Sequence, residues 1–346
     1  MGIHELFLLN LFYLASGFRK LPYIVAHKDA NSERVYEMKV SLPQFKVDKA
    51  DQYFCFTKFL EEIGEAYMLS TLIEFDIEHV HHFSLGFCDE PTDFAKNGPW
   101  ECSKNRGKYC PGSSVSGAFA DSYSNHNTGI VEYPKDISLK IGSLTRYRYL
   151  TLDTHFKTPV TELSNYPLVN VTLTFKKSPT KYNYQTQIMI ATGHIPAHID
   201  NGYSAEIACT WTKPEVVAFG VSMHTHHYGF MAEMFRVRKG TWTLLGSQLT
   251  KERPKDMYRI IGGFVDIKPG DIIAAKCLYI NKGDQPVKFG MGGEEEMCNA
   301  DISFGYDFKD EVNFTRTAAC VTKLPEFSFC DHKQTASICG INNVHE

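Results

Sequence analysis

The sequence predicts an all-β protein built from two domains. The chain has 346 residues, more than one ordinary hydrophobic core accommodates. Aromatic residues make up 13% of it, and short alternating runs rich in Val, Ile and Thr recur between turn residues. Many short strands at regular spacing are typical of β-sandwiches and barrels.

Five runs illustrate the predicted strands, at residues 35–42, 147–155, 169–175, 187–191 and 264–267. Turn sequences follow at 268–271 (KPGD) and 282–284 (KGD). Residues 88–128 are rich in Gly, Ser, Asn and Cys, so we expect a long loop there that disulfides hold in place.

The predicted domain boundary lies in residues 176–181 (KKSPTK), which are polar, contain a proline and separate two strand-like runs. We expect a first β-sandwich over 30–178, a second over 183–328 and a tail over 329–346. Residues 6–15 are apolar and precede small residues, which predicts a signal peptide over 1–17. Because Glu5 precedes this run and no basic residue does, an interfacial or buried helix is the alternative. No later stretch reaches the roughly 18 apolar residues that a membrane span needs.

The ten cysteines are even in number and include no CxxC pair, which favours disulfides over zinc. Disulfides need an oxidising compartment, so the predicted location is the secretory pathway, either secreted or in a granule lumen. Sequons at Asn170 and Asn313 predict glycosylation. The net charge of −4 and the lack of a basic run give no reason to expect nucleic acid.

Two groups of histidines are the informative feature. On a strand, His224 and His226 point to the same face and could chelate one metal ion, whereas His227 points away. In the other group, His79 and His81 share a face on a regular strand. His81 and His82 could share a metal only where the strand ends, twists or bulges. Either pair needs a third ligand.

Two further residues could complete these sets. His155 lies in a strand-like run and is a candidate third imidazole. Met297 offers a soft thioether, which together with imidazoles suits copper(I), although a core methionine is the commoner occurrence. Imidazole alone serves zinc and copper equally, so the choice of copper depends on spatial proximity that spacing does not give.

The chain resembles the peptidylglycine α-hydroxylating monooxygenases of the copper type II, ascorbate-dependent family, over residues 35–326. The stretches that carry the resemblance are YFC (53–55), VHH (80–82), GFC (86–88), THF (154–156), HTHHYG (224–229), FRVRKG (235–240), WTL (242–244), GDI (270–272) and EMCN (296–299).

The resemblance implies two copper ions held on two antiparallel, jelly-roll-like sandwiches packed side by side. An electron-transfer copper would be held by His81, His82 and His155. The resemblance therefore favours the pairing of His81 with His82 over that of His79 with His81. The oxygen-binding and catalytic copper would be held by His224, His226 and Met297. Asn299 and Tyr53 would contact substrate. The implied disulfides are Cys55–Cys102, Cys88–Cys110, Cys209–Cys320 and Cys277–Cys298. Cys330 and Cys339 remain and could pair with each other.

The implied reaction is hydroxylation of the Cα of a C-terminal glycine in a peptide, with ascorbate as reductant and O2 as co-substrate. It is the first step of C-terminal amidation, and a separate lyase would complete it. We expect a monomer without a stable membrane span.

Two positions depart from the family pattern. Members that use peptides have an arginine where this chain has Ser222, and a tyrosine where it has Asp301. A serine cannot supply the charge that pairs with a peptide carboxylate, although Arg236 or Arg238 could compensate. A related monooxygenase acting on a small amine or other non-peptide is therefore an alternative. A catalytically inactive secreted copper-binding homologue is another.

Overall fold

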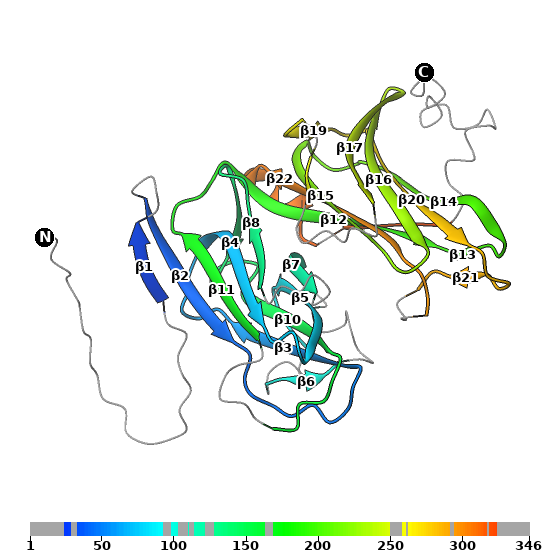
Figure 1. The fold of residues 1–346 in the computed structure, drawn as a ribbon. Coiled ribbons are helices and arrows are strands. Elements are labelled where there is room, and N and C mark those ends of the chain that lie inside the picture. Colours follow the sequence, from blue (N-terminus) through cyan, green and yellow to red (C-terminus); the bar gives the residue numbers. More distant parts are fainter. Residues whose placement is uncertain are drawn as a thin grey trace, which may run out of the picture.

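The computed structural model describes residues 24–28, 33–92, 98–102, 110, 114–121, 128–162, 169–249, 258–260, 262–290, 294–316 and 318–323. The expected signal peptide, the tail, Cys330 and Cys339 lie outside the described residues. Within them the structure is almost entirely β, which confirms the predicted fold class (Figure 1). None of the described helices is long and apolar enough to span a membrane.

The described residues of the first half form eleven strands. They are β1 (Ile24–Lys28), β2 (Arg34–Ser41), β3 (Gln52–Phe59), β4 (Ala66–Phe75), β5 (Val80–Cys88), β6 (Trp100–Glu101), β7 (Ser114–Asp121), β8 (Thr128–Glu132), β9 (Ile137–Ile141), β10 (Tyr149–Phe156) and β11 (Val169–Lys176).

The second half forms the remaining elements. They are β12 (Tyr182–Thr192), β13 (His194–Ile195), β14 (Ile199–Thr210), β15 (Val216–Thr225), β16 (Gly229–Arg238), β17 (Thr241–Leu249), β18 (Tyr258–Arg259), β19 (Val265–Ile267), β20 (Ile272–Asn281), β21 (Val287–Lys288), β22 (Cys298–Tyr306), the 3-10 helix η3 (Phe308–Asn313) and β23 (Ala318–Lys323).

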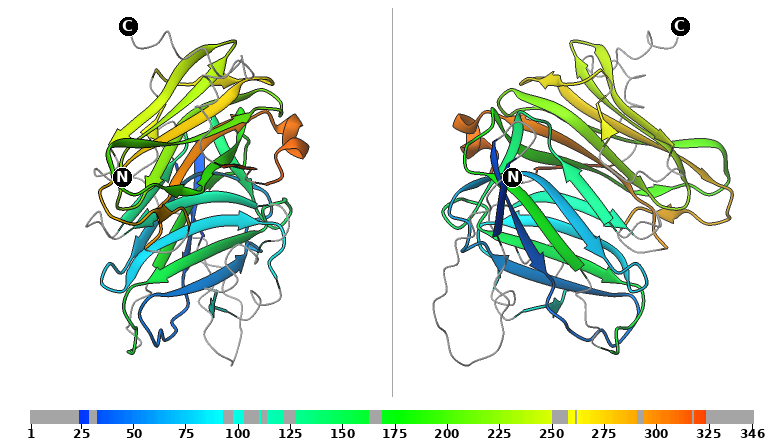
Figure 2. Two further views of the ribbon diagram at one scale, coloured as in Figure 1. Left: turned by 90° about the vertical axis from the view of Figure 1, so that its right-hand side faces the viewer. Right: turned by 60° about the vertical axis from the view of Figure 1, so that its left-hand side comes forward.

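The first half packs two layers around one apolar core. One layer is the sheet β6-β3-β10-β5-β7, and the other contains β1, β2, β11, β4 and β9 (Figure 2). Strand β11 alternates buried and part-exposed residues along its whole length, as a half-buried strand should. Its Val171, Leu173 and Phe175 join the same core cluster as Phe83 and Leu85 of β5. Burial of these side chains between the sheets provides the main driving force for folding here.

The second half repeats this plan with a separate core. The sheet β14-β20-β16-β17 supplies Ile207, Met234 and Ile273, and the facing strands supply Val221 and Ile302. Strands β15 and β22 are thus apolar on the inner face, which leaves their other face for polar side chains. That outer face carries the second of the two sites described below.

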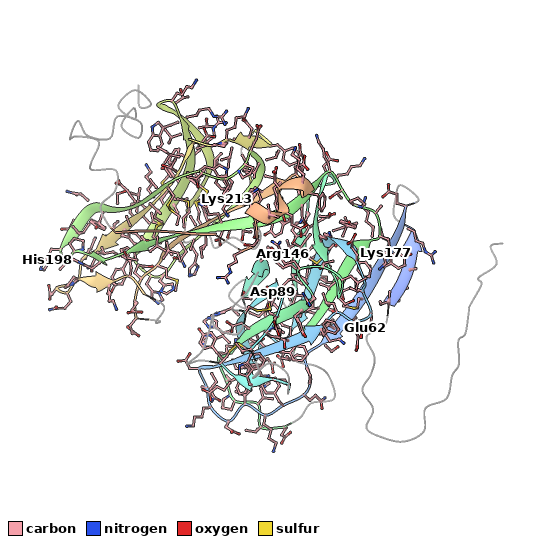
Figure 3. All side chains as sticks on the ribbon, turned by 180° about the vertical axis from the view of Figure 1, so that it is seen from behind. Glu62, Asp89, Arg146, Lys177, His198 and Lys213 are labelled. Atoms are coloured by element: carbon pink, nitrogen blue, oxygen red, sulfur yellow. A yellow bond between two sulfur atoms is a disulfide. The ribbon has the colours of Figure 1, made fainter. Side chains whose placement is uncertain are left out.

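The two halves share one sheet, which runs in the order β1-β2-β11-β4-β9-β12-β22-β15-β18. Its junction is a short parallel ladder between β9 and β12, in which Tyr182 pairs with Ile137. Arg146, labelled in Figure 3, also crosses between the halves and donates to the Glu311 carbonyl at 3.2 Å. The predicted linker 176–181 falls at the end of β11 and before β12, while the domain limits themselves stay a prediction.

The expectation of a long loop over residues 88–128 was wrong in part. Strand β7 lies within this stretch. It pairs with β5 and so forms the edge of the five-stranded sheet. Turn residues such as Gly and Ser hid this strand in the sequence. The eight cysteines that the structure describes form four disulfides, and these are the pairs that the resemblance implies: Cys55–Cys102, Cys88–Cys110, Cys209–Cys320 and Cys277–Cys298.

Candidate metal centres

The first candidate centre consists of three histidines on neighbouring strands. His81 and His82 are the second and third residues of β5, and His155 is the penultimate residue of β10. One ring nitrogen from each lies within 4.8 Å of the others, and the Nδ1 atoms of His81 and His155 are 3.1 Å apart. His155 is buried, while the other two are part-exposed. Three imidazoles gathered in this way form a donor set for a transition metal ion.

A β-bulge explains how two adjacent histidines reach one site. Along β10, His155 pairs with His82, but Phe156 pairs with Val80, so His81 is the extra residue. An extra residue turns the strand locally and re-aims its side chain. This is the irregularity that the pairing of His81 with His82 requires. His79 is held elsewhere, with its Nδ1 atom 2.8 Å from the Asp76 carboxylate.

Two neighbours orient His155. Its Nε2 atom lies 2.7 Å from the Asp51 carboxylate, and the Tyr53 ring stacks on the imidazole with centroids 4.1 Å apart. A carboxylate on the second ring nitrogen fixes the tautomer and orientation of a ligating histidine. Tyr53 therefore lies at the first centre, and its expected contact with substrate stays a prediction.

The second candidate centre lies at the end of β15. The rings of His224 and His226 have centroids 5.2 Å apart, and the Nδ1 atom of His226 lies 2.6 Å from the Glu295 carbonyl oxygen. His226 follows the last residue of the strand, where the chain turns towards β16. His227 is exposed.

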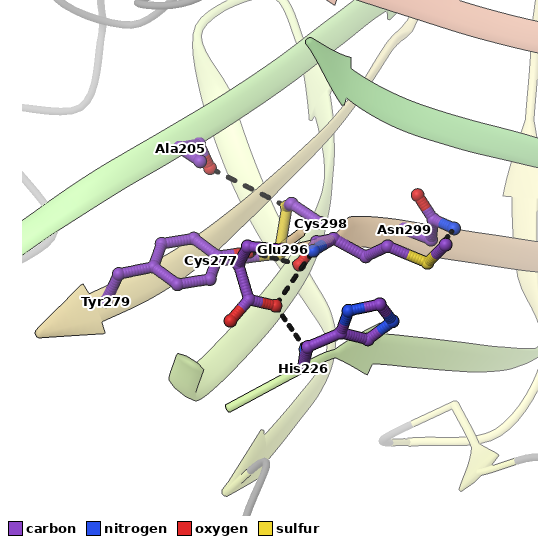
Figure 4. Close-up of a disulfide and its surroundings, with 8 residues drawn as sticks. Ala205, His226, Cys277, Tyr279, Glu296, Cys298 and Asn299 are labelled. Carbon is purple, nitrogen blue, oxygen red and sulfur yellow. Dashed lines mark hydrogen bonds between the residues drawn. A yellow bond between two sulfur atoms is a disulfide. The ribbon is translucent and has the colours of Figure 1, made fainter. Parts of the chain in front are cut away.

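Met297 directly precedes β22, the strand that pairs with the end of β15. His224 pairs with Asn299 across the sheet, and the Asn299 side-chain amide donates to the Met297 Sδ atom at 3.4 Å. The next residue, Cys298, is fixed by its disulfide to Cys277 (Figure 4). The hydroxyl of Tyr279 also donates to the Met297 carbonyl at 2.5 Å. The main chain that carries the thioether is therefore held at several points.

A buried carboxylate connects the two ligand segments. Glu296 is fully buried, and its Oε1 atom accepts hydrogen bonds from the backbone N–H groups of His226 and Met297. Its Oε2 atom accepts from the backbone N–H of Tyr228 at 2.8 Å. Charge-assisted hydrogen bonds of this kind are about twice as strong as neutral ones. Glu296 thus fixes the positions of His226 and Met297 relative to each other.

Both donor sets fit copper. The first offers three imidazoles, which serve copper or zinc, and the second combines two imidazoles with a thioether, which favours copper(I). The eight cysteines of the four disulfides are not available as thiolates. The candidate ligands are therefore imidazoles and one thioether, a combination that suits copper.

The outer face of β15 and β22 continues beyond the second centre. On this face, the next cross-strand pair after His224 and Asn299 is Ser222 with Asp301. Burial raises the pKa of the Asp301 carboxyl to about 7, although part of the residue stays accessible. The carboxyl is therefore recessed but reachable.

Arg236 and Arg238 do not compensate for the missing arginine at position 222. The Arg236 guanidinium donates to Asp266 and to Thr243. That of Arg238 donates to Asp271 at 2.7 and 2.6 Å and to Asp266. Both side chains belong to β16, in the other layer of this half.

Comparison with known proteins agrees with this arrangement. Residues 183–331 match the family model described as "Copper type II ascorbate-dependent monooxygenase, C-terminal domain". Residues 183–331 thus belong to the copper type II, ascorbate-dependent monooxygenase family. The match covers the strands that carry His224, His226 and Met297.

Curated relatives extend the similarity into the first half. Peptidyl-glycine alpha-amidating monooxygenase A of Xenopus laevis is 27% identical over 83% of this chain, and the Mus musculus protein is 25% identical over 81%. Human dopamine beta-hydroxylase is 22% identical over 75%. The chain spans only 29%, 28% and 45% of these proteins, respectively. Solved structures resemble it weakly, for example PNGF-II with a TM-score of 0.29 at 10% identity, covering 82% of this chain and 62% of that one.

The sequons lie in different surroundings. Asn313 is exposed at the end of η3. Asn170 lies on β11, where its side-chain oxygen accepts a hydrogen bond from the Ser41 hydroxyl at 2.6 Å. Asn313 is thus the more accessible acceptor, and glycosylation at either site stays a prediction.

Sequence reasoning missed two residues at these centres. Glu296 is the last of three consecutive glutamates, and the sequence does not tell which one is buried. Asp51 follows a polar stretch with a positive φ of 60°, a conformation that short polar residues tolerate. Only its contact with His155 singles it out.

Proposed function

We propose that this protein is a copper- and ascorbate-dependent monooxygenase that hydroxylates a carbon–hydrogen bond of its substrate. The observation that carries the proposal is that six side chains lie in two groups on paired strands. The first group has ring nitrogens within 4.8 Å of one another, and the second has two imidazole rings 5.2 Å apart beside the segment that carries a methionine. The groups are His81, His82 and His155 in one half, and His224, His226 and Met297 in the other.

The two sets suit different tasks. Copper at the first would store and pass an electron, and copper at the second would activate O2. The protein holds the ligands through the bulge at His81, the Asp51 contact and the Glu296 carboxylate. His224 is exposed, so substrate and oxygen can approach the second centre.

The substrate class has two candidates. A peptide with a C-terminal glycine is suggested by the names of the amidating relatives; the product would then pass to a separate lyase to complete amidation. A small amine is suggested by Ser222 and Asp301, which lack the positive charge needed to bind a carboxylate. The four disulfides support a secreted or lumenal location for either activity.

The proposal is tested by loading the protein with copper and counting the ions bound per chain. O2 uptake is then followed with ascorbate in the presence of a glycine-extended peptide or of 2-phenylethylamine. Mass spectrometry of the product detects the addition of one oxygen atom. Two ions and substrate-dependent uptake are expected. Copper binding without ascorbate-dependent uptake on either substrate would identify an inactive copper-binding homologue instead.

A further inference from the structure

Three strands place a carboxylate on the face that carries the second centre. Ser222 of β15 lies directly opposite Asp301 of β22, and Ile188 of β12 lies opposite Asp301 on its other side. Because alternate residues of a strand point to opposite faces, these three share the outer face. Their neighbours are in the core of the second half: Met189, Val221, Met223, Ala300 and Ile302.

Asp301 has no counter-charge in the part of the chain that the structure describes. No ion pair or hydrogen bond reaches its carboxylate there, and the Arg236 and Arg238 guanidinium groups are engaged by Asp266 and Asp271. Tyr184, which the Asp301 charge influences, is a neutral phenol. A recessed carboxylate without a partner is costly, and a cation from outside would remove that cost.

The position relates this carboxylate to the reacting site. His224 pairs with Asn299, and Asp301 lies two residues further along β22. Diagonal neighbours on one face are about 7–8 Å apart, so a small molecule can contact Asp301 while one of its carbons lies beside the second centre. Ile190 and Ile188 pair with Asn299 and Asp301, respectively. Both are part-exposed and supply an apolar border to the same surface.

We propose that Asp301, with Ser222 beside it, binds the cationic group of an amine substrate, and that Ile188 and Ile190 contact its hydrocarbon part. The inference rests on the proposed function and names the substrate class for that site. A substrate carboxylate would meet Asp301 as a like charge, whereas a protonated amine can donate a charge-assisted hydrogen bond to it and another to the Ser222 hydroxyl.

Binding to the copper-loaded protein without ascorbate tests this without turnover. Calorimetry measures the affinity for three probes: 2-phenylethylamine, 3-phenylpropanoate and an acetylated Phe-Gly dipeptide. We expect the amine to bind best, and Asp301→Asn to weaken its binding at least about tenfold because one charge-assisted hydrogen bond is lost. The matched control is Asp284→Asn, the same change at a side chain that is 91% exposed, and it should leave the affinity unchanged.

A second variant tests the assignment independently of Asp301→Asn. Ser222→Arg places a guanidinium opposite Asp301, so it should abolish amine binding and increase binding of the two carboxylates. Equal amine affinity in the wild type and Asp301→Asn, or a wild-type preference for either carboxylate, overturns the inference. If the dipeptide is then hydroxylated with ascorbate, the monooxygenase function stands and only the cation site fails. If binding behaves as expected but no probe is oxidised, the cation site stands and the monooxygenase function fails.

Discussion

Glu296→Gln is the most direct test of how the second centre is held together. The carboxylate accepts three backbone hydrogen bonds, from His226, Met297 and Tyr228. A glutamine keeps one oxygen for His226 and Met297, but its NH2 group would face the Tyr228 N–H, donor against donor. It loses one charge-assisted bond, which contributes about 1.5–3 kcal/mol, and weakens the other two.

The expected cost is therefore about 3 kcal/mol in the free energy of unfolding. At roughly 2–4 °C per kcal/mol for a domain of this size, Tm should fall by about 6–12 °C. Because His226 and Met297 are no longer fixed relative to each other, copper affinity at the second centre should fall about 10–100-fold, as for other residues that orient metal ligands. The first centre should keep its affinity.

Thermal unfolding of the metal-free protein and copper titration against a competing chelator measure these two effects separately. Glu295→Gln is the matched control, since that side chain is 33% exposed and its carboxylate meets Lys288 at 3.4 Å. If Glu296→Gln and Glu295→Gln behave alike in both measurements, the Glu296 carboxylate does not hold the centre together.

Three further predictions follow from the same contacts. Met297→Ala should lower ascorbate-dependent O2 uptake at least about 100-fold while circular dichroism stays unchanged, because the thioether is a soft ligand for copper(I); an unchanged rate removes this ligand assignment. His155→Ala should lower bound copper from two ions to one and stop turnover, with the remaining ion still sensitive to Glu296→Gln; two retained ions contradict the first centre. Asp301→Asn should stabilise the fold above pH 7 by at most about 4 kcal/mol, because the carboxyl, with its pKa raised to about 7, makes the wild type lose stability as pH rises from about 4 to 7. Parallel stability curves for the two proteins between pH 4 and 8 would show that Asp301 ionises without penalty.

The fold class could be predicted because the alternation of apolar and polar residues along a strand is visible within a short stretch of sequence. Residues 169–175 were predicted as a strand, and β11 occupies Val169–Lys176. Strand β7 was missed since glycine and serine occupy positions where pairing with β5, a non-local contact, decides the structure.

The candidate centres were predictable only in part. The same-face relation of His224 and His226 follows from strand geometry, but the joint use of His81 and His82 depends on a bulge that the pairing with β10 creates. Met297 is 71 residues from His226 in sequence, and only the pairing of β22 with β15 brings it near. The resemblance to a known family supplied these relations, whereas Glu296 and Asp301 required the structure.

The shared sheet affects how the molecule can come apart. Tyr184 and Phe219 belong to the second half of the chain yet pack in the core of the first. Buried Gln185 donates to the Tyr147 hydroxyl at 3.2 Å across the same boundary. Separating the halves would expose these aromatic rings and break such bonds. The core of the first half is therefore complete only when the second half packs against it. Truncation to a single half would therefore leave an incomplete core in the part that is kept and lower the cooperativity of its unfolding.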